Sequence, residues 1–109
     1  MTDLRFINEI VEDIKRLRIV YPEQTRFINE LEKCVTADIC DTIDAKVYIY
    51  KAKALMTALF DTIEEENFDD RCITDMQYAE VISKIKTVAV DLDISVTAYI
   101  EYLRGEYYL

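Results

Sequence analysis

Residues 42–66 read TIDAKVYIYKAKALMTALFDTIEEE, a stretch without glycine or proline in which apolar residues recur every three or four positions. This spacing predicts one long α-helix with two apolar stripes. The first stripe holds Ile43, Val47, Tyr50, Ala54, Leu55 and Leu59, and the second holds Ile49, Ala52, Met56, Phe60 and Ile63. A helix that is apolar on two sides is expected to pack against neighbours on both, so this stretch predicts the central helix of a bundle.

The rest of the chain has the same character, with one glycine, one proline and no histidine among 109 residues. Glycine and proline interrupt helices, and their scarcity favours long helices joined by short polar links. The length indicates a single domain over residues 1–109, and the 51% apolar content is enough for a core. No segment alternates with a period of two, so we expect an all-α fold without a sheet, a compact bundle of four to five helices.

The first half of the chain contains two predicted helix ends. A helix over about residues 3–20 should end before Tyr21-Pro22, because the residue preceding proline avoids the helical conformation. Pro22 suits the first turn of a second helix, where its missing N–H has no partner to lose. Residues 36–42 contain two threonines and two aspartates, which are poor helix formers, and we predict a break or kink there.

The second half is expected to form two further helices. A capping box, Thr74-Asp75-Met76-Gln77, predicts the start of a helix that runs to about residue 92. Ser95 is predicted to cap a fifth helix, and Gly105 to end it in the left-handed conformation that favours glycine.

One short phrase occurs twice. Residues 5–10 read RFINEI and residues 26–31 read RFINEL. The repeat is consistent with duplication of a helix whose copies now pack as an antiparallel pair. It is equally consistent with convergence on a good amphipathic phrase.

The composition argues against most catalytic chemistry. Without histidine the chain lacks the usual general base and the commonest transition-metal ligand, and one glycine cannot build a phosphate-binding loop. The three cysteines, Cys34, Cys40 and Cys72, have no metal-site spacing and are expected to be free thiols in a reducing cytoplasm. No signal peptide or membrane span is visible. We therefore expect a cytoplasmic protein that is not an enzyme and has no cofactor.

Carboxylate pairs remain the alternative to that expectation. Glu9-x-x-Glu12 and Glu66-x-x-Asp69 are similar to the paired acids of all-helical nucleotide pyrophosphohydrolases. That resemblance implies a magnesium ion held against substrate phosphates. Acidic helices often contain such pairs without binding a metal, and we predict no metal site.

A run of acidic residues is the first candidate binding surface. Residues 61–70 contain six acids and no base in a chain of net charge −9. Acids near the C-terminal end of a helix oppose its dipole and repel one another, so a basic partner would offset an unfavourable arrangement. The predicted partner-binding residues are Asp61, Glu64, Glu65, Glu66, Phe68, Asp69 and Asp70. A solvated helix end is the plainer interpretation.

Tyrosines gather at the C-terminal end, forming the second candidate surface. Tyrosine is enriched at interfaces because it offers a large contact area at low entropic cost. The predicted self-association residues are Tyr99, Tyr102, Tyr107, Tyr108 and Leu109. The alternative is that this end folds back on the core of its own chain.

Residues 89–103 carry small and apolar residues at Ala89, Leu92, Ile94, Ala98 and Leu103, with Ser95 as a cap. This pattern resembles the turn and second helix of a helix-turn-helix, and the resemblance implies specific DNA binding. Asp93 stands where the usual turn glycine belongs, and acidic residues would face the phosphates, which disfavours direct nucleic-acid binding.

The leading hypothesis is therefore an interaction protein that binds, and inhibits or neutralises, a basic protein such as a toxin or an enzyme acting on nucleic acid. Immunity proteins, antitoxins and phage inhibitors share this physical profile of short, acidic, helical chains without a catalytic set. A homo-oligomer built through the tyrosine-rich end and a degenerate helix-turn-helix regulator are the alternatives.

Overall fold

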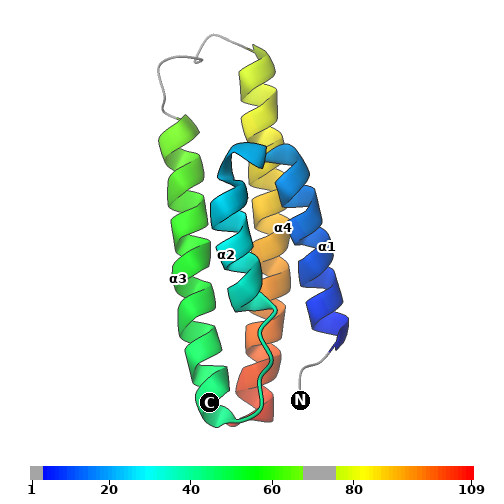
Figure 1. The fold of residues 1–109 in the computed structure, drawn as a ribbon, viewed down its shortest axis with the longest axis vertical. Coiled ribbons are helices and arrows are strands. Elements are labelled where there is room, and N and C mark those ends of the chain that lie inside the picture. Colours follow the sequence, from blue (N-terminus) through cyan, green and yellow to red (C-terminus); the bar gives the residue numbers. More distant parts are fainter. Residues whose placement is uncertain (1–3, 68–75) are drawn as a thin grey trace.

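The computed structural model describes residues 4–67 and 76–109, which are almost entirely helical (Figure 1). The described elements are α1 (Leu4–Val20), the short 3₁₀ helix η1 (Pro22–Gln24), α2 (Thr25–Val35), α3 (Thr42–Asn67) and α4 (Met76–Glu106). There is no strand within these two ranges. The all-α bundle that the sequence predicts is confirmed, with four α-helices.

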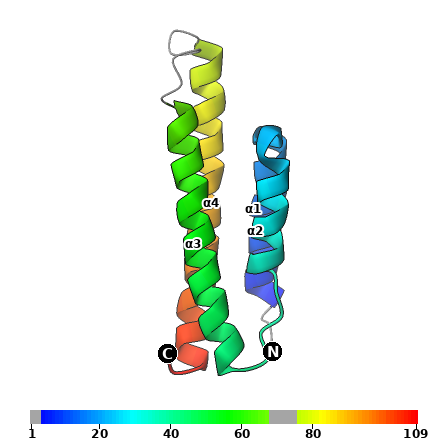
Figure 2. The same ribbon diagram turned by 60° about the vertical axis from the view of Figure 1, so that its left-hand side comes forward.

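The helices run alternately up and down, and each lies beside the next one in the chain (Figures 1 and 2). The ring closes because α1 packs along α4, while α2 and α4 both pack against α3. The α1–α2 pair is shorter than the α3–α4 pair, so α3 and α4 extend beyond it at one end of the molecule (Figure 2). In an up-and-down bundle, helices that follow one another in the chain usually pack side by side and are joined by short links.

The core is made by the inward apolar stripe of each helix. The side chains that are fully buried include Ile10, Ile14, Leu17, Ile28, Leu31, Leu59, Ile63, Ile85, Leu92 and Tyr99. Ile39, in the link between α2 and α3, is also buried and belongs to this core. Burial of each aliphatic side chain contributes about 1.5–3 kcal/mol, so the core accounts for most of the stability of the fold.

The repeated phrase lies on two neighbouring antiparallel helices. RFINEI is in α1 and RFINEL is in α2, and these helices pack against each other. Ile10 and its counterpart Leu31 are both fully buried. This arrangement fits both duplication and convergence.

The predicted ends of the first two helices are confirmed. The helix α1 ends at Val20, and Pro22 occupies the first position of η1, which leads into α2. The helix α3 begins at Thr42, directly after Asp41, whose carboxylate accepts the Asp44 N–H at 2.8 Å. The Asp44 carboxylate in turn accepts the Cys40 N–H at 3.1 Å, so two otherwise free amides are satisfied at this helix start.

The predicted break between residues 92 and 95 is wrong. The helix α4 passes through this region without interruption, because its buried stripe continues from Leu92 through Val96 and Tyr99 to Leu103. Ser95 caps no helix. Its hydroxyl donates a hydrogen bond of 2.6 Å to the Asp13 carboxylate on α1. Neither glycine nor proline is present to stop the helix, and the four helices described include no helix-turn-helix turn at Asp93.

The predicted role of Gly105 is also wrong. Gly105 lies inside α4, has no positive φ, and an added Cβ would meet no atom within 4 Å. The left-handed residue is instead Tyr108, with φ of 56°. The Leu109 N–H reaches back to the Arg104 carbonyl at 2.9 Å, which closes a Schellman-type end three residues later than predicted.

Polar contacts fasten α1 to both of its neighbours. Arg16 contacts Asp13 at 3.2 Å and Asp91 of α4 at 3.1 Å, beside the Ser95 hydrogen bond. On the other side, Arg18 contacts Glu32 of α2 at 2.7 Å. These contacts fix the register of α1 between α2 and α4.

The predicted capping box begins at Thr74 and Asp75, which lie outside the described residues. None of the described helices is both long and apolar enough to cross a membrane.

Candidate interaction surfaces

The described part of the acidic run lies on the last turns of α3, near η1, where Glu66 contacts Gln24. Asp61, Glu64 and Glu65 are exposed, and none of them forms an ion pair within the described part of the chain. We call these three residues the acidic end. Phe68, Asp69 and Asp70 belong to the same prediction but lie outside the described residues.

Glu66 has a role different from that of the acidic end, because it is partly buried and hydrogen-bonded. Its carboxylate accepts a hydrogen bond of 3.4 Å from Gln24 of η1, and its backbone carbonyl accepts one of 2.8 Å from the Tyr78 hydroxyl of α4. Burial, followed by repulsion from the Glu66 carboxylate, raises the pKa of Tyr21. Glu66 therefore links three elements, and only part of its surface remains for a partner.

The tyrosines predicted for self-association divide between core and surface. Tyr99 is fully buried, so its place on an association surface is a wrong prediction. Its ring stacks on Phe6 of α1 at 5.5 Å and meets Tyr48 of α3 edge-on at 5.2 Å. Tyr102 is half-buried against Phe6 at 5.0 Å. The reason is the continuous stripe of α4, which turns these rings toward α1 and α3.

The last three residues are less enclosed. Tyr107 is half-buried, Leu109 is 40% exposed and Tyr108 is 95% exposed. Tyr107, Tyr108 and Leu109 border a shallow cavity together with Tyr50 and Arg104, between the start of α3 and the end of α4. Self-association through these three residues stays a prediction.

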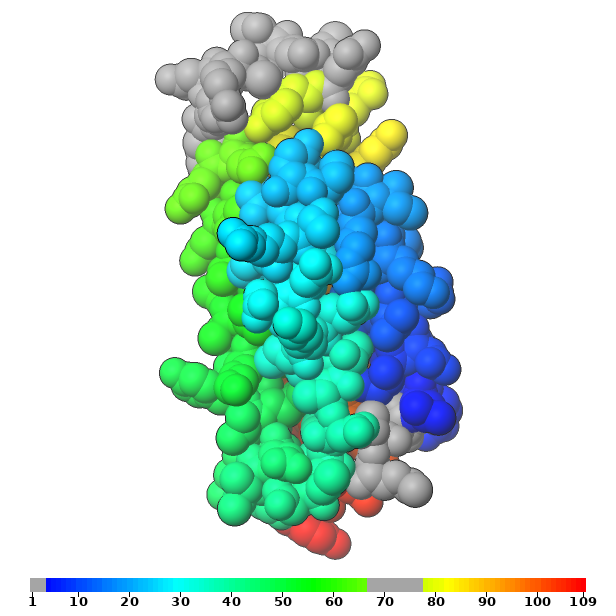
Figure 3. All heavy atoms as spheres, viewed as in Figure 1, coloured from blue at the N-terminus to red at the C-terminus, as the bar shows by residue number. Residues whose placement is uncertain are grey.

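The outer face of α3 is a surface that the sequence prediction missed. Part of the first predicted stripe faces outward, with Ile43 71%, Val47 44% and Tyr50 77% exposed, whereas Leu59 of the same stripe is buried as predicted. Figures 1 and 3 show α3 along one side of the molecule, with no described helix covering its outer side. We use "outer face of α3" for the exposed side chains between Ile43 and Glu65.

Charge is divided along this face. Lys46, Lys51 and Lys53 are exposed in the first half of α3, and the acidic end occupies the second half. Within the described residues, none of these three lysines forms an ion pair. The pattern is visible in the sequence, but only the fold tells which face of α3 remains uncovered.

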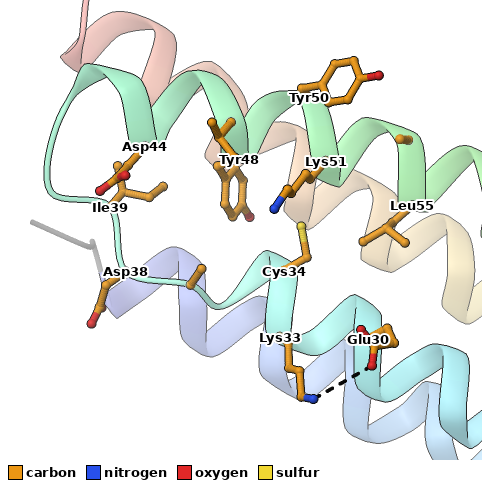
Figure 4. A pocket seen from close by; sticks show the side chains of 13 residues that line it. Glu30, Lys33, Cys34, Asp38, Ile39, Asp44, Tyr48, Tyr50, Lys51 and Leu55 are labelled. Carbon is orange, nitrogen blue, oxygen red and sulfur yellow. Dashed lines mark ion pairs between the residues drawn. The ribbon is translucent and has the colours of Figure 1, made fainter.

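A groove of about 580 Å³ lies beside this face, between α2, α3 and the link that joins them (Figure 4). Figure 4 shows the Lys51 amine directed toward Cys34, whereas Tyr50 points away from the groove. Burial raises the pKa of Cys34, and the Lys51 charge only partly opposes this. The thiol is therefore mainly protonated near neutral pH, which argues against its use as a nucleophile. Its groove is suited to contact rather than to chemistry.

The geometry supports neither the resemblance to a helix-turn-helix nor the resemblance to nucleotide pyrophosphohydrolases. Val96 and Ile100, in the proposed DNA-reading helix, are buried in the core and cannot contact bases. Among the described residues no group of three or more cysteine, aspartate or glutamate side chains is arranged to hold a metal ion. Glu9 and Glu12 lie within α1, whereas Glu66 contacts η1 beyond the end of α1.

Comparison with known proteins adds no family to this description: no family model, curated protein or solved structure matches the chain.

Proposed function

We propose that this chain is a small helical interaction protein that binds a basic protein partner through the acidic end of α3. The observation that supports the proposal best is the state of Asp61, Glu64 and Glu65. All three are exposed, none is ion-paired within the described residues, and they lie on the outer face of α3, whose outer side no described helix covers. A partner can therefore approach them from this open side.

Electrostatics supplies the driving force in this proposal. The carboxylates stand near the C-terminal end of α3, where the helix dipole is also negative, and no basic residue lies in its last turn. A cationic partner relieves this repulsion, and the net charge of −9 accelerates its approach. A protein that acts on nucleic acid presents such a cationic surface, so binding would block that surface and neutralise the partner.

The proposed role is binding rather than catalysis. The described residues include no cluster of metal-ligating side chains, and Cys34, the more enclosed of their two thiols, has a pKa raised by burial. Inhibition would follow from steric and electrostatic occupation of the partner's surface.

A direct experiment is to capture partners from the native host at low salt and then to measure binding of the purified partner. The test variant is Asp61→Asn/Glu64→Gln/Glu65→Gln, which keeps side-chain size and removes charge. If each carboxylate contributes about 0.5–1 kcal/mol, affinity should fall roughly tenfold to hundredfold.

The matched control is Glu9→Gln/Glu12→Gln/Glu106→Gln, which removes the same charge from exposed residues elsewhere. It should change affinity by less than about threefold. Equal losses in the two variants would mean that net charge alone matters, and a partner that is acidic or insensitive to salt would refute the proposal.

A further inference from the structure

The charges on the outer face of α3 run against the dipole of the helix. The three lysines lie in its N-terminal half and the acidic end in its C-terminal half. Glu64 and Glu65 lie in the last turn, where the dipole is negative and each carboxylate costs a few tenths of a kcal/mol. Within the described residues, none of these lysines and carboxylates forms an ion pair with α2 or α4. A second helix in the opposite direction would supply countercharges to both groups.

The charges are also placed symmetrically about one point on the helix. Lys53 and Asp61 each lie about one turn from Thr57, and Lys51 and Glu65 each lie about two turns from it. At about 100° per residue, Lys46, Lys53 and Glu64 share one flank of the outer face, and Lys51 and Glu65 share the other. A two-fold axis near Thr57 brings matching flanks together in an antiparallel pair. It thus sets the lysines of one copy opposite the carboxylates of the other.

From this geometry we infer that two copies of the chain associate through the outer faces of their α3 helices, antiparallel to each other. The centre of the face suits close approach, because Ala54 and Thr57 are small, exposed and uncharged. Tyr50, which is 77% exposed and points away from the α2–α3 groove, lies about two turns from Thr57, so in the antiparallel pair it lies beside the second half of α3 in the other copy. Burial of the Tyr50 ring adds an apolar contribution to the ion pairs.

A second copy fits this face better than other occupants do. A parallel helix pair would set lysine against lysine, and a nucleic acid following α3 would meet the acidic end. The pairing needs no other partner, so it is independent of the proposed function. Both use the acidic end, and a basic partner should therefore compete with self-association.

The test is the molar mass in solution, measured by light scattering or sedimentation from micromolar to millimolar concentration. The wild-type chain should form a dimer whose dissociation constant rises at least about tenfold between low and high salt. Two charge-reversed variants examine the face. One is Lys46→Glu/Lys51→Glu/Lys53→Glu, and the other is Asp61→Lys/Glu64→Lys/Glu65→Lys.

Each variant alone should be a folded monomer by circular dichroism and mass, because its two faces then carry like charges. An equimolar mixture should form a heterodimer, because one face is now acidic and the other basic. The control Arg26→Glu/Lys84→Glu/Lys86→Glu has the same net charge as the first variant but leaves α3 unchanged, so it should still dimerise.

Several results would overturn the inference. A wild-type chain that stays monomeric at millimolar concentration excludes the pairing, as does a mixture of the two variants that stays monomeric. If each variant alone still dimerises, the interface lies elsewhere, for example at Tyr108 and Leu109. Oligonucleotide binding by the lysines without self-association would also contradict the inference. None of these results would affect binding of a basic partner by the monomer, so the two proposals fail separately.

Discussion

The buried ring of Tyr99 allows a sharp prediction about the C-terminal end of the chain. Tyr99→Ala removes a fully buried ring that contacts Phe6 at 5.5 Å and Tyr48 at 5.2 Å. Truncation of a buried aromatic residue to alanine costs about 3–5 kcal/mol, and each aromatic pair contributes about 0.5–1.5 kcal/mol of it. We expect the free energy of unfolding to fall by about 4 kcal/mol, measured by urea denaturation and far-ultraviolet circular dichroism.

The matched control is Tyr108→Ala, because Tyr108 is 95% exposed. Its free energy of unfolding should stay within about 0.5 kcal/mol of the wild type. If Tyr99→Ala does not fold, Tyr99→Leu keeps part of the ring volume and should lose about 2 kcal/mol. A loss below about 1 kcal/mol for Tyr99→Ala, or equal losses at both positions, would refute the account of α4 as one helix with Tyr99 in the core.

Three further substitutions test other parts of the fold, each by urea denaturation. Ser95→Ala removes the 2.6 Å hydrogen bond to Asp13 and should lower the free energy of unfolding by about 1–2 kcal/mol, whereas an unchanged value would mean that this bond is not formed. Gly105→Ala should raise the free energy of unfolding by about 0.5–1 kcal/mol, because Gly105 is helical with open space around it; a decrease would restore the left-handed prediction. Burial raises the pKa of Tyr48 above its ordinary value of 10.0, so the folded chain keeps a proton that the unfolded chain loses. The contribution of Tyr48 to the free energy of unfolding is therefore complete below about pH 10, and the free energy of unfolding declines above it. Tyr48→Phe should make this decline shallower by up to about 1.4 kcal/mol per pH unit.

Local chemistry explains which parts of the fold were predictable. Pro22 determines the end of α1 and the start of η1 through its own ring, whatever the rest of the chain does. The start of α3 at Thr42 follows from Asp41 and Asp44, whose carboxylates accept backbone N–H groups nearby. Such signals act within a few residues, so sequence alone locates them.

Tertiary packing decided the parts that were not predictable. Ser95 and Gly105 have the residue types of a helix start and a helix end, yet packing of α4 along α1 and α3 keeps the helix continuous through both. The helix propensities of single residues differ by only about 1 kcal/mol, and burial of a whole apolar stripe contributes more than that.

The candidate surfaces show the same division. The acidic run and the tyrosine-rich end are visible in the composition, but which members are exposed depends on how the helices are arranged. Val47 and Tyr50 are apolar at helical spacing, which predicts burial, and only the absence of a described neighbour on that side of α3 leaves them exposed. Periodicity identifies an apolar stripe without telling whether another element covers it.

The packing of α1 along α4 has a consequence for synthesis of the chain on the ribosome. The partners of Phe6, Asp13 and Arg16 include Tyr99, Ser95 and Asp91, which lie far along the chain and are translated long after α1. The α1–α2 hairpin therefore emerges with one apolar side that stays exposed to solvent until α4 has left the exit tunnel. At about 5–20 residues per second, this interval lasts several seconds, during which chaperones and proteases compete with folding.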